Sequence, residues 1–103
     1  MNNNRNLEDL LSRYLSEKLL RPDTVKAYKQ VAHRWIKDTE ISDIRRIDSE
    51  AVLEWRNMVL ERASPATWNS YRRHMSALLN FAAKKKLVKT NPFLEIAAAS
   101  NVA

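Results

Sequence analysis

The chain contains no glycine in its 103 residues, and this absence restricts its fold more than any other feature. Tight β-hairpins and phosphate-cradling loops normally need glycine, because glycine adopts positive φ angles without steric cost. Walker-type and dinucleotide-binding loops are therefore excluded. The prolines, Pro22, Pro65 and Pro92, stand where periodic segments begin or end. This pattern predicts an all-α fold.

Apolar residues recur at intervals of three and four along four segments, which is the pattern of amphipathic helices that share one core. Asparagine, aspartate, serine and proline stand at the starts of these segments, where such residues cap or begin helices. The expected helices run from an Asn6 cap to Lys18, from Pro22 to Lys37, from an Asp48 or Ser49 cap to Arg62, and from Pro65, after a Ser64 cap, into the lysines at 84–86. The sequence thus predicts a compact bundle of four main helices in a single domain.

Each helix is expected to turn one stripe inward. The predicted core consists of Leu7, Leu10, Leu11, Tyr14 and Leu15; Val25 or Thr24 with Tyr28, Val31, Ala32 and Trp35; Val52, Trp55, Met58 and Val59; and Trp68, Tyr71, Met75, Leu78, Leu79 and Ala82. The irregular connection 38–47 should add Ile41, Ile44 and Ile47. We expect a domain of residues 1–96, followed by a tail or linker at 97–103, and the segment after Pro92 is either a short fifth helix or a linker.

The charge of the chain is unevenly distributed. Its net charge is +6, but residues 21–37 carry five bases and one acid and residues 64–103 carry six bases and one acid, whereas 38–63 carry four bases and seven acids. Two helical segments therefore hold the positive charge, and the one between them is acidic, with its carboxylates expected on a solvated face. This separation predicts an anionic partner bound in a defined orientation.

Several kinds of chemistry are not expected. The absence of cysteine excludes disulfides and thiolate-bound zinc, and the two histidines are far apart, so we expect no metal or cofactor. A nucleophile elbow would need glycines. The N-terminal residues lack the apolar run of a signal peptide, and no segment approaches the roughly 20 apolar residues of a membrane span. The expected location is the cytoplasm, without contact to a membrane or a small-molecule substrate.

Basic and amide side chains follow the predicted second and fourth helices. Lysine and arginine neutralise phosphates, and asparagine, glutamine, serine and arginine reach phosphate oxygens or base edges. Lys26, Lys29 and His33 share one side of the second helix; the fourth presents a free face of Ser70, Arg73, Ala77, Asn80 and Lys84, near Asn69, Arg72 and His74. These faces are typical of a nucleic-acid-binding surface, although a merely solvated face is the alternative for either one. The lysines at 84–86 are explained equally well by the helix dipole.

The order of the motifs resembles the N-terminal, core-binding (SAM-like) domain of the tyrosine recombinases, the phage integrase family. That family has a threonine with a spaced tyrosine on one helix, a later Thr-x-x-x-hydrophobic helix, and an ending that runs from alanine through glycine to Asn-Pro. The matching residues here are Thr24, Tyr28 and Trp35; Thr67, Tyr71, Met75 and Leu78; and Ala82, Leu87, Val88, Asn91 and Pro92. Where the family usually has glycine, this chain has Lys86, so either a non-glycine residue takes the left-handed cap or the helix ends differently.

The resemblance implies a domain that grips duplex DNA at a recombination site with its second and fourth helices, in company with other recombinase protomers. The residues that it implies for DNA binding are Thr24, Lys26, Lys29, Gln30, His33, Thr67, Ser70, Arg73 and His74. The family's catalytic tyrosine, arginines, lysine and His-x-x-Arg element belong to a separate domain, and Ile36 and Ala77 stand where that arginine would follow His33 and His74. We therefore expect no catalytic residue and no enzyme activity from this chain by itself.

Two other functions are compatible with the pattern. The leucine stripe of the first helix could dock on a neighbouring protomer, which would make the chain a helical protein-interaction or oligomerisation module. The chain could also be a small stand-alone basic DNA-binding regulator. Charge reversal on the second and fourth helices separates the interaction module from a DNA-binding domain, because it should abolish DNA binding and leave self-association intact.

Overall fold

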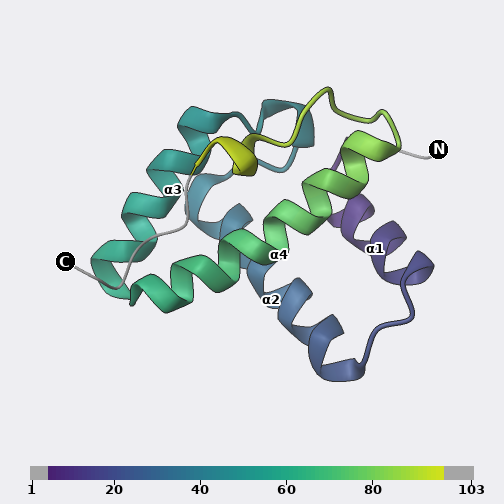
Figure 1. Cartoon of the computed structure of the whole chain (residues 1–103), viewed down its shortest axis with the longest axis horizontal. Helices are drawn as coiled ribbons and strands as arrows, with labels where there is room; N and C mark the ends of the chain where they lie inside the picture. Colours follow the sequence, from purple (N-terminus) through teal and green to yellow (C-terminus); the bar gives the residue numbers. More distant parts are fainter. Residues whose placement is uncertain (1–4, 97–103) are drawn as a thin grey trace.

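The computed structural model describes residues 5–96, and over this range the chain is helical without a β-strand. Its elements are α1 (Leu7–Glu17), α2 (Pro22–Thr39), the 3₁₀ helix η1 (Ile44–Arg46), α3 (Ser49–Arg62), α4 (Pro65–Lys84) and the 3₁₀ helix η2 (Pro92–Glu95). In Figure 1 α4 crosses in front of α2, with α1 on one side of this pair and α3 on the other. The predicted all-α bundle is confirmed, and the tail predicted at 97–103 lies outside the described residues.

Side-chain caps start three of the four helices where the sequence predicts them. The Asn6 side chain accepts a hydrogen bond from the Glu8 amide at 2.7 Å, and Asp48, rather than Ser49, accepts from the Ala51 amide at 2.8 Å. Ser64 accepts from the Thr67 amide at 3.2 Å. These bonds satisfy backbone donors that have no partner within the helix. Helix α2 instead begins with proline after Arg21, has no side-chain cap, and ends two residues later than predicted.

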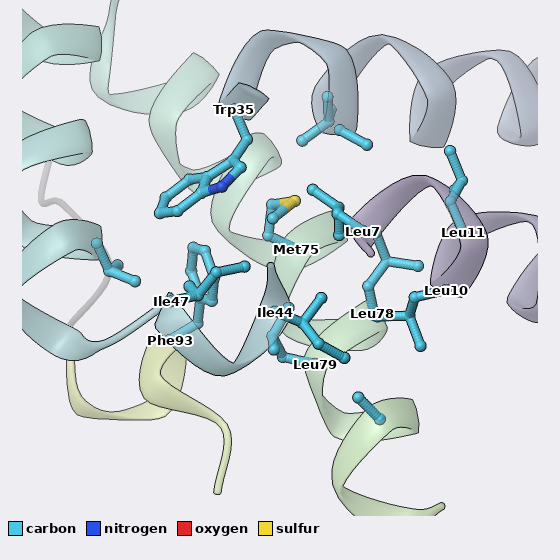
Figure 2. Packing of buried hydrophobic residues seen from close by; sticks show 14 of the residues in the cluster. Leu7, Leu10, Leu11, Trp35, Ile44, Ile47, Met75, Leu78, Leu79 and Phe93 are labelled. Atoms are coloured by element: carbon cyan, nitrogen blue, oxygen red, sulfur yellow. The ribbon is translucent and has the colours of Figure 1, made fainter. Parts of the chain in front are cut away.

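One end of the core is aliphatic. Figure 2 shows leucines of α1 and α4 gathered with Ile44 of η1, and Met75 lying between them and Trp35. Leu7, Met75 and Leu78 are 0% exposed. Most of the predicted core is therefore present, with Ile44 and Ile47 buried from the connection between α2 and α3, but neither Val25 nor Thr24 belongs to it. Among the corrections, Phe81 and Phe93 are buried although no stripe included them, and Ala77, expected on the free face of α4, packs partly against the core.

The other end of the core is aromatic and centres on Trp55 of α3. Its ring meets Trp35 of α2 edge-on at 5.0 Å and stacks on Tyr71 of α4 at 5.5 Å. It also contacts Trp68 of α4 and Phe93 of η2, at 5.6 and 6.4 Å. Edge-on and offset aromatic pairs of this kind stabilise a core beyond the area that they bury. One tryptophan thus joins three helices and the C-terminal turn.

Asp38 holds the indole of Trp55 in place. Trp55 Nε1 donates to Asp38 Oδ2 at 2.9 Å, and Arg34 and Arg62 bind the same oxygen, Arg34 at 3.3 Å. The Asp38 side chain is only 7% exposed. Burial raises the pKa of Asp38, but the hydrogen bonds of Trp55 and Arg62 and the charge of Arg34 outweigh it, so that the pKa lies below its ordinary value. The expectation of solvated carboxylates throughout 38–63 is wrong for this residue.

The segment after α4 turns back and is fastened along that helix. The Asn91 side chain is buried, and its amide donates to the Ser76 carbonyl at 2.9 Å and to Asn80 at 3.1 Å. Its oxygen accepts from the Phe93 amide at 3.0 Å, which starts η2 and directs Phe93 into the core. The short fifth helix allowed by the sequence is therefore a 3₁₀ turn, with Ile96 held by Arg72 at 2.7 Å.

The end of α4 decides between the two alternatives left open at Lys86. Lys86 has a φ of 62°, the left-handed conformation that glycine usually supplies. Its amide binds the Ala83 carbonyl at 3.0 Å and the Leu87 amide binds the Ala82 carbonyl at 2.9 Å, which is the Schellman pattern of helix termination. A lysine therefore occupies the left-handed cap, at a steric cost that glycine would not incur.

Replacing Lys86 with glycine should stabilise the protein, because the left-handed conformation costs an L-residue about 1 kcal/mol more than it costs glycine. We expect a gain of about 0.5–1 kcal/mol in the free energy of unfolding by urea denaturation, since glycine's greater freedom in the unfolded chain offsets part of the relief. Lys84→Gly, at the last helical residue, is the matched control and should lose up to about 1 kcal/mol. A loss of stability for Lys86→Gly would contradict the cap.

The Asp38 cluster predicts a specific pH dependence. Because the folded-state pKa of Asp38 is lowered, its carboxylate stabilises the fold above the ordinary carboxyl pKa, and this contribution is lost as the pH falls through the folded value. Asp38→Asn should cost about 1–3 kcal/mol at pH 6, where the charged hydrogen bonds are intact. The difference between the two proteins in urea denaturation should shrink below about pH 4. A difference that stays constant down to about pH 3 would refute the role of the charge.

Candidate nucleic-acid interface

The predicted basic helices meet where α2 and α4 cross. The ring of Tyr28 on α2 contacts the ring of His74 on α4 edge-on, with 4.7 Å between their centroids. On its other side Tyr28 packs against Tyr14 of α1 at 5.1 Å, and the two hydroxyl groups share a hydrogen bond of 3.2 Å. In Figure 1 the N-terminal halves of α2 and α4 diverge from this crossing.

Tyr28 is a packing residue at this crossing rather than an acid or a nucleophile. Burial raises the pKa of its hydroxyl well above the ordinary tyrosine value, the hydrogen bond with Tyr14 adds to the shift, and the nearby charge of Arg73 opposes it. The hydroxyl therefore stays protonated at neutral pH.

Four of the predicted DNA-binding residues lie around this contact. Ser70 and His74 are half-buried, Arg73 is exposed, and Thr24 lies one turn before Tyr28 on the same side of α2, about 40° around the helix. Arg73 belongs to none of the ion pairs within residues 5–96. We call these four residues, Thr24, Ser70, Arg73 and His74, the crossing surface.

The other predicted residues of α2 form a separate stripe. All are exposed and lie about 100–160° around the helix from Tyr28, which places them on its outer side. This outer stripe of α2 consists of Lys26, Lys29, Gln30 and His33. His33 Nε2 lies 3.8 Å from Glu8 of α1, whereas Lys26 and Lys29 have no ion pair in the described part of the chain. Thr24, unlike the lysines, therefore lies on the side of α2 that carries Tyr28, the residue that meets α4.

The N-termini of α2 and α4 differ in whether a side chain caps their first backbone amides. At α4 the hydroxyls of Ser64 and Thr67 lie 3.2 Å apart, so the predicted contact residue Thr67 already shares in the cap. At α2 no side chain covers the first amides, and Arg21 stands at the cap position. A helix start with uncovered amides favours a negatively charged group.

Two predicted cations are engaged elsewhere. Arg72 Nε donates to the Ile96 carbonyl at 2.7 Å, so this side chain fastens the C-terminal turn instead of joining the exposed face of α4. Lys85 pairs with Glu17 of α1 at 3.1 Å and lies over the Phe81 ring. The pKa of Glu17 is lowered, first by its hydrogen bond with Lys85. Lys85 thus serves contacts between helices.

Sequence reasoning missed Asn91 and Asp38 as structural residues. Asn91 carried a signal, because it precedes proline in the family ending, but nothing in its neighbours showed that its amide would reach Ser76 and Asn80. Within residues 5–96 we find no group of three or more His, Asp or Glu side chains placed to hold a metal ion. No helix in the same range is long and apolar enough to cross a bilayer.

Comparison with known proteins assigns the chain to a family. It is 32% identical over 88 residues to a Pseudomonas syringae protein described as a tyrosine recombinase XerC, a match that covers 84% of this chain and 19% of the relative. A Pseudomonas aeruginosa protein of the same description is 30% identical over 91 residues, covering 84% and 21%. The chain belongs to the tyrosine recombinase family. Its motif order and helical fold correspond to the N-terminal domain of such a recombinase.

The chain spans about a fifth of the length of the curated relatives that it matches. No protein-family model matches it, and no solved structure gives a significant match. The relation to the tyrosine recombinases therefore rests on two sequence matches that agree with the order of the motifs.

Proposed function

We propose that this chain is the DNA-binding, core-binding domain of a tyrosine recombinase and that it holds duplex DNA at a recombination site with α2 and α4. Residues 1–96 form this domain in our proposal, and 97–103 lead toward a catalytic domain. Relatives described as tyrosine recombinases match 84% of the chain, and this observation carries the proposal. Arg73, which is exposed and has no ion pair within residues 5–96, lies beside the junction of the two helices and supports it further.

The charges on the two helices suit a polyanion. Lys26, Lys29 and Arg73 are exposed and have no carboxylate partner within residues 5–96, so no internal ion pair has to break before they meet phosphate. Phosphate contacts of this kind position a protein on the duplex and release counterions, whereas base edges supply the sequence information. Thr24, Gln30, Thr67, Ser70 and the two histidines complete the proposed contact set.

Binding should be weak and steeply dependent on salt. With about four phosphate contacts the affinity for a mixed-sequence duplex should fall about 100-fold between roughly 50 and 200 mM salt. Fluorescence anisotropy with a labelled duplex measures this slope. An affinity that does not change over this range would show that phosphates do not drive the binding.

Arg73→Ala should weaken duplex binding and reduce the slope of log affinity against log salt by about 0.9, because one phosphate contact is lost. Arg46→Ala is the matched control. Arg46 is also exposed, but it lies in η1, after the C-terminal end of α2. The length of α2, roughly 27 Å, separates that end from Pro22 at the start of the helix. Arg56 is less suitable, since its Nε is buried. Equal losses for Arg73→Ala and Arg46→Ala would place the interface elsewhere.

The surface expected for the alternative role, a protein-interaction module, is not exposed. The leucines of α1 proposed for docking on a neighbour are buried in the chain's own core, with Leu7 0%, Leu10 1% and Leu11 5% exposed. Leu19, in the link between α1 and α2, is instead fully exposed and adjoins Lys18. Contact between recombinase protomers therefore remains a proposal, and the leucine stripe of α1 does not provide its surface.

A further inference from the structure

His74 is held in one tautomer by its own helix. Its Nδ1 lies 2.7 Å from the backbone carbonyl of Ser70, and a carbonyl oxygen can only accept a hydrogen bond. Nδ1 therefore carries the hydrogen and donates. In the neutral imidazole the other nitrogen, Nε2, then has a free lone pair and acts as an acceptor.

The free nitrogen of His74 reaches the surface. Within residues 5–96 Nε2 has no hydrogen-bond partner and no carboxylate in ion-pair range. The buried side-chain nitrogens without a partner in that range are Arg56 Nε and Trp68 Nε1. Because His74 Nε2 is not among them, it is not a buried atom. The edge-on contact with Tyr28 at 4.7 Å fixes the ring plane. His74 thus presents an oriented acceptor at the junction of α2 and α4.

A hydrogen-bond acceptor binds different groups of DNA from those that the surrounding cations bind. Lysine and arginine side chains only donate, which suits phosphate oxygens and the acceptor atoms of guanine. A neutral Nε2 cannot bond to a phosphate oxygen, because both atoms accept. The hydrogen-bond donors that DNA offers in the major groove are the exocyclic amino groups, N6 of adenine and N4 of cytosine.

On the basis of the proposed function, we propose that His74 is a specificity residue of the crossing surface. Its Nε2 accepts a hydrogen bond from the amino group of an adenine or a cytosine in the major groove. The Ser70 carbonyl positions the acceptor, and Arg73 beside it holds the phosphate backbone. His33 does not have this role, because its Nε2 lies near the Glu8 carboxylate and no backbone bond fixes its tautomer.

The test deletes single amino groups from the DNA. A duplex is first selected from a randomised library at pH 7.5, and each adenine is then replaced in turn by purine and each cytosine by 2-pyrimidinone, which lack the amino group. For the wild-type chain we expect one position at which this deletion weakens binding about three- to tenfold, the value of one hydrogen bond.

Two variants isolate the acceptor. His74→Arg carries only donors, so it should respond to no amino deletion. His74→Gln keeps an acceptor oxygen and should retain part of the response. Circular dichroism melting verifies that both variants fold, and a variant that does not fold is replaced by His74→Lys or His74→Asn, respectively.

The outcomes separate this inference from the proposed function. If the chain binds duplex DNA but selects no sequence, or if His74→Arg keeps the wild-type response to the amino deletions, the role of His74 is refuted and the DNA-binding function stands. If the chain binds no duplex at all at low salt, both fail. A position whose response disappears with His74→Arg establishes the acceptor.

Discussion

The arrangement of the helices depends on the indole of Trp55. Four aromatic rings from α2, α4 and η2 meet it, and its only polar atom is satisfied by Asp38 at 2.9 Å. Burying an indole whose N–H had no partner would cost free energy, so the buried ring depends on the carboxylate as its hydrogen-bond acceptor. Because Asp38 also binds Arg34 and Arg62, the ends of α2 and α3 are joined by packing and by charge at one place.

This cluster determines how the proposed DNA surface is supported. Tyr71 stacks on Trp55, and it lies on α4 only two residues before Arg73 and three before His74. On the same stretch of α4, about 60° around the helix from Tyr71, His74 rests on Tyr28 and, through it, on Tyr14 of α1. The exposed Arg73 thus extends from a turn of helix in which Tyr71 and His74 are both packed against other helices.

The sequence was sufficient to predict most of the fold, because local signals agreed with it. Caps at Asn6, Asp48 and Ser64 and proline at the start of α2 and α4 define the helices, and apolar spacing identifies their buried sides. Contacts distant in sequence could not be predicted in this way. Nothing near Asp38 shows that Trp55 and Arg62 will reach it, and residues near Phe93 have no helical period. For the site, periodicity identified exposed side chains but not which side of α2 meets α4, so the contact of Tyr28 with His74 required the structure.

The central claim, that duplex DNA is held where α2 and α4 cross, is tested most directly by following the backbone amides of the ¹⁵N-labelled chain by NMR during titration with a short duplex at low salt. The account predicts fast-exchange shifts concentrated in the first half of α2 and between Thr67 and His74, while η1 and the turn around Lys86 stay unchanged. Shifts concentrated at η1 or at the Lys86 turn, or no shifts at any amide, would contradict it.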